Sequence, residues 1–392
     1  MTETTQPLEF DPYSHAVHDD PFSYYQRLRD EAPVYRNDRL GFTALSRYHD
    51  VLAALHDHDT YCSRYGITLE PRSPLPMMIT MDPPDHTVMR RVVSRTFTPR
   101  RIADLEPRIR QLSANYLAAW DGAASGDLIA DYAAKLPMDV ISSMLGVPES
   151  EQDLLRGWSD LMVHREEGNP DITDAGIESA IKLYQYFTAA VKERRTGSDA
   201  DDLLTGLVAA EVDGARLTSD EVVAFCVLLV IAGNETTTKL IGNACYWLWA
   251  FPDQRQLALD DPGLLPEVVE ETLRHEGSTQ IMARTTTRDV VLHEVTIPEG
   301  EKVLLLLGSG NRDERFWDRP DQFDIRRDTR QHLSFGHGLH VCLGAALARL
   351  ETRIALGDVL ARAGAYEIDA GGLVRMHSGN VRGYANMPIT FA

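Results

Sequence analysis

The sequence predicts one mainly α-helical domain with a small β region, extending over residues 1–392. Three observations favour this fold class. Apolar residues recur at helical spacing through long segments, β-branched runs are confined to short stretches, and neither a fixed-period repeat nor a Gly/Ser linker divides the chain. The content of 43% hydrophobic and 25% charged residues is typical of a folded protein with a sizeable core.

Helical signals dominate the chain. Thr218 and Glu221 form a capping box ahead of an apolar segment, 219–249, which keeps helical spacing and should cross the centre of the protein. Shorter helices are expected over residues 264–275 and directly after Cys342. Strand character is local, and the β-rich parts are expected at about residues 34–48, 284–307 and 366–392.

Charge and cysteine content restrict the partners and the compartment. The formal net charge of −20 disfavours nucleic acid and anionic membranes as partners. The four cysteines, at positions 62, 226, 245 and 342, show neither close pairing nor metal-ligand spacing, which suits a reducing cytoplasm. The polar start, residues 1–13, has no export signal, and the most apolar stretch, residues 222–233, is shorter than the roughly 20 residues of a membrane span. We expect a cytoplasmic protein without membrane insertion.

The most informative segment surrounds Cys342. Gly336 and Gly338 permit backbone angles that other residues avoid, shortly before a cysteine that is expected to open a helix. Amides at a helix N-terminus stabilise a thiolate, and Phe335 would shield the sulfur from water. This geometry suits a metal-binding thiolate, although an isolated cysteine is more often only a small buried apolar residue.

Residues 335–344 match the haem-binding loop of the cytochrome P-450 family, Phe-Gly-x-Gly-x-His-x-Cys-x-Gly, at every defined position. Further marks of the family follow in order between about Asp82 and Arg353. The chain therefore resembles a haem-thiolate monooxygenase with haem b as cofactor, dioxygen as co-substrate and Cys342 as the iron ligand. The resemblance, with a cationic pair four residues apart on one helical face, implies these haem-contacting residues: His86, Arg90, Ala232, Gly233, Arg284, Phe335, Gly336, His340, Cys342, Gly344 and Ala348.

The long apolar segment contains Ala-Gly-Asn-Glu-Thr-Thr at 232–237, a poor choice if packing alone decided the sequence. Gly233 would remove bulk beside the haem, and the Thr236 hydroxyl can bond the Ala232 carbonyl and loosen the helical ladder, leaving room for dioxygen and water. The family pattern implies that Glu235 and Thr236 are the catalytic pair that delivers protons. Alternatively, Glu235 only caps a kink or pairs with an arginine.

A second helical pair, Glu271 and Arg274, is spaced to form an ion pair and resembles the Glu-x-x-Arg brace of the family. Many members carry an arginine where this chain has Gln322. We expect Arg326 or Arg327 to replace it as the third member of the brace.

An apolar, proline-punctuated loop lies ahead of the segment that carries His86, where the family usually covers its substrate. Its methionines would suit an apolar organic molecule, although ordinary packing explains any one of them equally well. The expected substrate pocket comprises Met77, Met78, Ile79, Leu229, Ala232, Thr236 and Ile281.

The chain has no room for a fused reductase and lacks the motifs of one. Electrons should come from a separate ferredoxin with its NAD(P)H-dependent reductase. The expected docking surface is a local arginine-rich face that breaks the acidic trend, formed by Arg91, Arg95, Arg100 and Arg101, with Arg349 as a further candidate.

The reaction that the resemblance implies is hydroxylation or epoxidation of a small, largely apolar organic substrate. A peroxide-driven peroxygenase is the alternative within the same chemistry. A non-catalytic haem-binding or gas-sensing protein is the alternative from another class, as is a protein of this fold that binds no haem.

Overall fold

The computed structural model describes residues 7–70, 75–164, 166, 169, 171–212 and 214–391. The first six residues, on which the prediction of a start without an export signal partly rests, lie outside the described residues. The α-helices are α1 (His15–Asp19), α2 (Pro21–Glu31), α3 (Tyr48–His56), α4 (Asp85–Ser94), α5 (Pro99–Asp104), α6 (Glu106–Ala118), α7 (Leu136–Met144), α8 (Glu149–Val163), α9 (Asp174–Arg195), α10 (Leu203–Ala209), α11 (Ser219–Ala250), α12 (Pro252–Asp260), α13 (Leu265–Glu276), α14 (Leu307–Gly310) and α15 (Ala345–Ala363).

The strands are short, and the predicted mainly helical class is confirmed. Those of the largest sheet are β1 (Val34–Asn37), β2 (Phe42–Leu45), β3 (Tyr61–Cys62), β7 (Ile281–Thr286) and β10 (Lys302–Leu306), in the order β1-β2-β10-β7-β3. The others are β4 (Ser125–Asp127), β5 (Glu211–Val212), β6 (Ala215–Arg216), β8 (Val290–Leu292), β9 (Val295–Ile297), β11 (Tyr366–Ile368), β12 (Val374–Arg375), β13 (Tyr384–Asn386) and β14 (Pro388–Phe391).

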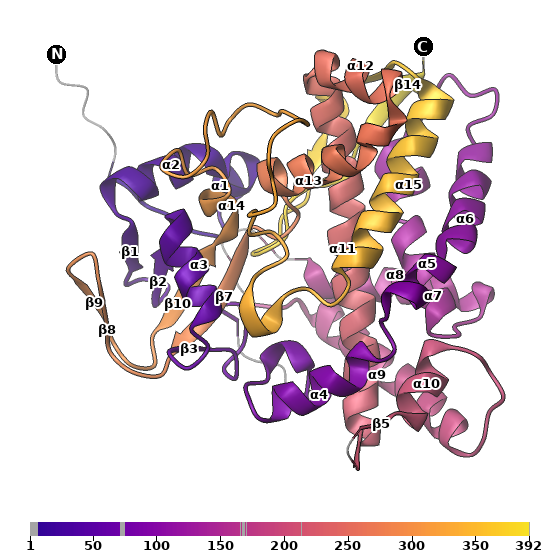
Figure 1. The fold of residues 1–392 in the computed structure, drawn as a ribbon, viewed down its shortest axis with the longest axis horizontal. Coiled ribbons are helices and arrows are strands. Elements are labelled where there is room, and N and C mark those ends of the chain that lie inside the picture. The colour runs from indigo at the N-terminus through magenta and orange to yellow at the C-terminus, as the bar shows by residue number, and fades with distance from the viewer. Residues whose placement is uncertain are drawn as a thin grey trace.

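The large sheet and the helices form two neighbouring parts of the molecule (Figure 1). The sheet is built from the N-terminal strands and from the segment after α13, with Val303 of β10 opposite Arg284 of β7 and Thr43 of β2. Helices α1 to α3 lie beside the sheet. Helices α6 to α10, α12, α13 and α15 lie in the other part, around α11. The register matters for the site because it places Arg284 in the middle of the sheet.

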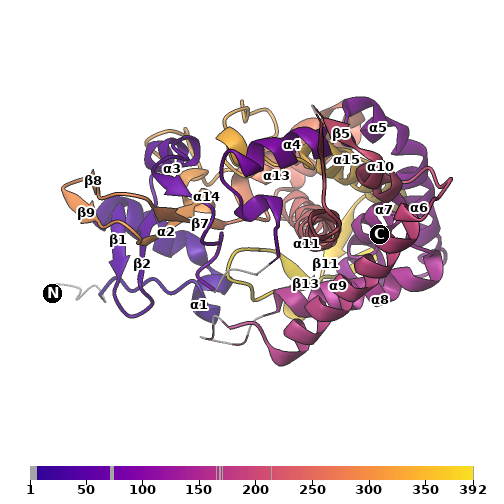
Figure 2. The same cartoon turned by 90° about the horizontal axis from the view of Figure 1, so that it is seen from below.

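Helix α11 is the centre of the helical part, as predicted. Figure 2 shows it end-on, with α7, α9 and α15 packed beside it. It begins with the predicted capping box, in which the Glu221 N–H donates to Thr218 Oγ1 (3.2 Å) and the Thr218 N–H donates to Glu221 Oε2 (2.8 Å). The capping box satisfies backbone donors that a helix start would otherwise leave free.

The length of α11 corrects one argument made from the sequence. Its 32 residues are long and apolar enough to cross a membrane, so a short apolar stretch is not the reason to expect otherwise. The distinguishing feature is burial, since 61% of its most apolar window is covered by the rest of the protein. A core helix of a globular fold has this property.

Candidate active site

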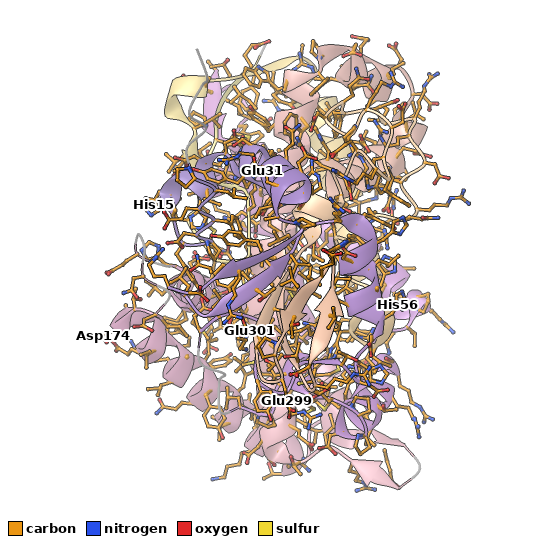
Figure 3. The ribbon with its side chains drawn as sticks, turned by 90° about the vertical axis from the view of Figure 1, so that its left-hand side faces the viewer. His15, Glu31, His56, Asp174, Glu299 and Glu301 are labelled. Carbon is orange, nitrogen blue, oxygen red and sulfur yellow. The ribbon has the colours of Figure 1, made fainter. Side chains whose placement is uncertain are left out.

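The loop before Cys342 depends on its two glycines. Gly336 and Gly338 have φ angles of +66° and +69°, which residues with a side chain rarely adopt. A Cβ atom on Gly338 would lie 2.7 Å from the carbonyl oxygen of Leu55, at the end of α3. His56, which follows Leu55 and is labelled in Figure 3, has its ring 5.6 Å from that of His337. The loop is therefore held tightly against α3.

The loop folds back on itself, because the Cys342 N–H donates to the Phe335 carbonyl at 2.8 Å. The expectation that Cys342 opens a helix is wrong, since α15 begins only at Ala345. The expected stabilisation of the thiolate still holds, because two backbone N–H groups are directed at the sulfur. They belong to Gly344, in the turn before α15, and to Ala345, its first residue.

Protein surrounds Cys342, yet its surface is accessible. This combination is expected of a residue that lines an interior space. Burial raises the pKa of the Cys342 thiol, whereas the amides of Gly344 and Ala345 and the positive charges of Arg90 and Arg349 act in the opposite direction. These groups all favour the thiolate. A cation bound at the sulfur would complete this tendency, because coordinating thiols are deprotonated.

Helix α11 has an accessible turn in its middle. Ala232 is exposed and Gly233 and Thr236 are partly exposed, whereas Asn234, Glu235 and Thr237 of the same turn are buried. Thr236 Oγ1 donates to the Ala232 carbonyl at 2.7 Å, which is the bond predicted from the sequence. The helix nevertheless stays continuous through this turn.

Gly233 also has a packing role in the structure. A Cβ atom there would lie 2.1 Å from Cδ1 of Ile141, so this glycine allows α11 to pack closely on α7. The room for a small ligand beside Ala232 and Thr236 arises from the accessible face of the helix.

Two histidines and two arginines converge near the cysteine loop, of which His86 and Arg284 are buried and Arg90 and His340 are partly exposed. The rings of His86 on α4 and His340 are 4.2 Å apart, and both ring nitrogens of His86 are buried without a hydrogen-bond partner. Burial and Arg284 lower the pKa of His340 to about 3, and burial lowers the pKa of Arg284 to about 10. Burial also lowers the pKa of His86 and of Arg90.

In the part of the chain that the structure describes, Asp82 is the acid whose charge acts on His86, Arg284 and His340. Arg284 donates only to the Ala283 carbonyl (2.8 Å), and Asp82, the acid close to His340, is already paired with Arg64 at 2.7 Å. The desolvated guanidinium groups of Arg90 and Arg284 are costly without an anion beside them, and the imidazoles of His86 and His340, whose pKa values are lowered, can donate ring N–H hydrogen bonds to the same anion. The two propionates of a haem are suitable anions, so the residues present fit this cofactor.

A cluster of charges lies behind Glu235, on the buried side of α11. Lys239 Nζ is 3.4 Å from Glu235 Oε2, and both side chains are buried. Asp160 on α8 contacts Glu235 and accepts a weak hydrogen bond from Asn234 Nδ2 (3.5 Å). Burial and Glu235 raise the pKa of Asp160 to about 7. Because Asp160 is itself exposed, it connects the buried acid to solvent.

Asp160 and Lys239 were missed in the sequence. Lys239 could have been found, because it lies four residues after Glu235 on the same helix. Asp160 carries no such signal, since it lies on another helix and no motif surrounds it.

The brace predicted for Glu271 and Arg274 is a buried bidentate ion pair, with N–O distances of 2.8 and 2.7 Å. Arg327 is the arginine that joins it, at 3.4 Å from Glu271. Gln322 contributes only its backbone carbonyl, which accepts from Arg274. Arg326 is exposed, and its side chain is not part of this network.

The residues expected around the substrate lie in two places. Leu229 is partly exposed on the same face of α11 as Ala232 and Thr236, and Met77 and Ile79 are partly exposed in the loop before α4, whereas Met78 is buried in the adjoining core. Ile281 is not on that face. Ile281 is instead buried in the core cluster of Phe10, Tyr25 and Leu306, which packs on one face of the large sheet. Its side chain points to this face of β7 and not toward α11.

An enclosed cysteine on a glycine-shaped loop, an accessible turn of a core helix and a cluster of two histidines and two arginines define a haem-thiolate site. Comparisons with known proteins give the same result. The family model for cytochrome P-450 matches residues 257–363. The cytochrome P-450 123 of Mycobacterium tuberculosis is 46% identical over 390 residues, which cover 98% of this chain and 97% of that protein.

Two further relatives cover nearly the whole chain. The vitamin D(3) 25-hydroxylase of Pseudonocardia autotrophica is 40% identical over 400 residues, covering 99% of this chain and 98% of that protein. The solved structure of the cytochrome P-450 CYP109Q5 from Chondromyces apiculatus is 37% identical, with a TM-score of 0.90 and 98% coverage of both chains. The chain belongs to the cytochrome P-450 family. It is a monooxygenase with a haem-thiolate cofactor and dioxygen as co-substrate.

Proposed function

We propose that this cytochrome P-450 hydroxylates or epoxidises a largely apolar organic molecule in the cytoplasm, with electrons supplied by a separate ferredoxin and its reductase. The observation that carries the proposal is the accessible face of α11, where Leu229, Ala232 and Thr236 combine two apolar side chains with one hydroxyl. Such a surface admits an apolar substrate next to a proton donor.

Three kinds of residue would hold the cofactor. Cys342 would ligate the iron, and the histidines and arginines of the cluster, His86, Arg90, Arg284 and His340, would bind the propionates. When bound, haem supplies the activation of dioxygen, from which one oxygen atom enters the substrate and the other leaves as water. The chain's own contribution is to hold the thiolate, exclude bulk water and deliver protons.

Proton delivery is proposed to run from solvent through Asp160 and Glu235 to Thr236. Asp160 is accessible and has a pKa of about 7, so it can take up and release a proton near neutral pH. Its contact with Glu235 passes the proton to the buried side of α11, where Lys239 holds the Glu235 carboxylate. The Thr236 hydroxyl, held by the Ala232 carbonyl, would present the last proton to the open face.

The ferredoxin is proposed to dock on the cysteine side, over α4 and α5. Arg91, Arg95 and Arg100 are exposed there, and Arg90 in the same helix lies close enough to Cys342 to affect the thiol. Arg349 adds to this surface, but it is already paired with Glu270 (2.5 and 2.9 Å) and lies over the Phe335 ring. An acidic partner would therefore meet Arg95 and Arg100 before Arg349.

A steroid- or secosteroid-like molecule is the first substrate class to test, because a relative 40% identical is a vitamin D(3) 25-hydroxylase. We expect such a molecule to shift the absorption band of the haem on titration and to gain one oxygen atom when ferredoxin, reductase and NAD(P)H are supplied. Turnover with hydrogen peroxide but none with redox partners would favour a peroxygenase. Haem binding with no turnover by either route would favour a sensor.

The relay has its own test. Thr236→Ala should keep the haem and the thiolate spectrum but divert reducing equivalents from product to hydrogen peroxide, because the last proton donor is gone. Thr238→Val is the matched control, since Thr238 lies on the same helix and bonds the Ala133 carbonyl (3.1 Å) in the core. Equal peroxide yields from wild type and Thr236→Ala would remove Thr236 from the relay.

A further inference from the structure

The segment that leaves α13 touches α11 at the turn that contains Thr236. Ser278 is buried, and its Oγ donates to the backbone carbonyl of Thr236 at 2.5 Å. The hydrogen bond joins two elements that are 42 residues apart in the chain. It holds the backbone of the residue whose side chain presents the hydroxyl to the open face.

The preceding residue contacts the cysteine loop. A Cβ atom on Gly277 would lie 2.4 Å from Ser334 Oγ and 2.7 Å from the Leu273 carbonyl, so the chain passes closely over Ser334. Ser334 is itself fixed, because its hydroxyl donates to Leu273 and accepts from Asn311 Nδ2 at 2.8 Å. Ser334 immediately precedes Phe335, the first residue of the haem-binding loop.

Ser278 is also anchored from a third direction. Its carbonyl accepts from the Arg382 N–H at 2.7 Å, and the Arg382 side chain pairs with buried Glu276 at 2.8 Å. Two residues further on, the Gln280 N–H donates to the Asn380 carbonyl at 2.9 Å. The segment is therefore a rigid support rather than a loose connection, and a small movement of Ser278 is resisted on every side.

We propose that Ser278 is a positioning residue, which fixes the Thr236 turn of α11 relative to the loop that carries Cys342. The inference rests on the proposed proton relay and deepens it. Gly277 contacts the cysteine loop at Ser334, and Ser278 contacts α11 at Thr236. Together they set the position of the proton donor relative to the ligand loop. Sequence motifs of the site include neither residue.

Removal of the Ser278 hydroxyl should therefore affect the use of protons more than the folding of the protein. Ser278→Ala should bind haem with an unchanged thiolate spectrum. The fraction of electrons lost as hydrogen peroxide should rise roughly fivefold, which is the change in population that the loss of a typical hydrogen bond produces. Ser278→Thr, which keeps a hydroxyl, should restore most of the coupling.

The decisive experiment compares Ser278→Ala, Ser278→Thr and the control Thr238→Val, all as haem-loaded protein. Hydrogen–deuterium exchange of the α11 amides around residue 236 reports the anchoring directly, without any turnover. We expect faster exchange there in Ser278→Ala alone, together with the rise in peroxide. Thr238→Val should lose stability without either change, because its hydrogen bond lies on the other side of α11.

The outcomes separate this inference from the relay itself. If Thr236→Ala raises the peroxide yield but Ser278→Ala leaves both exchange and peroxide at wild-type values, the relay stands and the positioning role of Ser278 is wrong. If Thr236→Ala leaves the peroxide yield unchanged, the relay is wrong, and faster exchange in Ser278→Ala would then support an anchoring role that serves no proton transfer.

Discussion

The two sides of the site are built in different ways. On the cysteine side, one contiguous segment from Phe335 to Ala345 provides the loop, the ligand and the amides directed at the sulfur. On the α11 side, the proposed relay brings Glu235 and Thr236 together with Asp160 from α8 and with Ser278 from the segment after α13. The contiguous side is rigid through backbone geometry, whereas the assembled side can be adjusted by single side chains.

The comparison predicts that changes on the cysteine side remove the cofactor or the fold. Cys342→Ser should have the largest effect on function, because a hydroxyl is a poor substitute for a thiolate ligand. Product formation should fall below detection in the reconstituted system. The control is Cys245→Ser, a buried cysteine of α11 outside the site, which should keep its activity wherever the protein folds. Residual turnover in Cys342→Ser would contradict the assignment of the ligand.

The next largest effect is expected on stability, when the buried ion pair of Glu271 and Arg274 is broken. Arg274→Ala should destabilise the protein by about 3–5 kcal/mol, since it leaves Glu271 buried without its partner. The free energy of unfolding in urea measures this. Arg326→Ala, which removes an exposed arginine nearby, should change it by less than about 0.5 kcal/mol. Similar losses in the two variants would show that the brace is not what holds this region.

The sequence predicted more of the contiguous side than of the assembled side, although it placed at Cys342 a helix start that lies at Ala345. Glycines at fixed positions before Cys342 identify the loop, and spacing along one helix predicts both the Thr218 cap and the bond from Thr236 to Ala232. Asp160 and Ser278 act through contacts with residues far away in the chain, which only the packing of α8, α11 and α13 creates. The same limit explains Ile281, which lies outside the β-rich stretch expected from about residue 284, begins β7 and is buried in the core on one face of the large sheet.

The assembled side should respond to pH. The pKa of Asp160 is raised from 3.8 to about 7, so the folded protein binds this proton more tightly than the unfolded chain. The stabilisation is present in full below the unfolded pKa and is lost as the pH rises through about 7. Asp160→Asn should therefore lack the decrease in urea midpoint that the wild type shows between about pH 5 and about pH 8.

The same variant, Asp160→Asn, also tests the relay. In the wild type the yield of product per electron should fall as the pH rises and Asp160 loses its proton. In Asp160→Asn the yield should be low at every pH, without this fall. Asp153→Asn is the control, since Asp153 lies on α8 but its carboxylate is bound to Arg156 at the surface. An unchanged pH profile in Asp160→Asn would exclude Asp160 from proton delivery.

The smallest effect is expected for docking on the cysteine side. Arg95→Glu should lower the rate of reduction by ferredoxin at low salt, at most roughly tenfold, and should weaken its dependence on salt. Arg36→Glu on β1, in the sheet part of the molecule, should leave both unchanged. Equal rates and salt dependence in the two variants would place the docking surface elsewhere.

The most direct test of the account is the carbon monoxide difference spectrum of the dithionite-reduced protein, because it reports which atom holds the iron. The account predicts the strongly red-shifted Soret band of a thiolate ligand, present in the wild type and lost in Cys342→Ser. A band typical of histidine ligation, or no haem after expression with adequate haem supply, would contradict the central claim that Cys342 is the iron ligand.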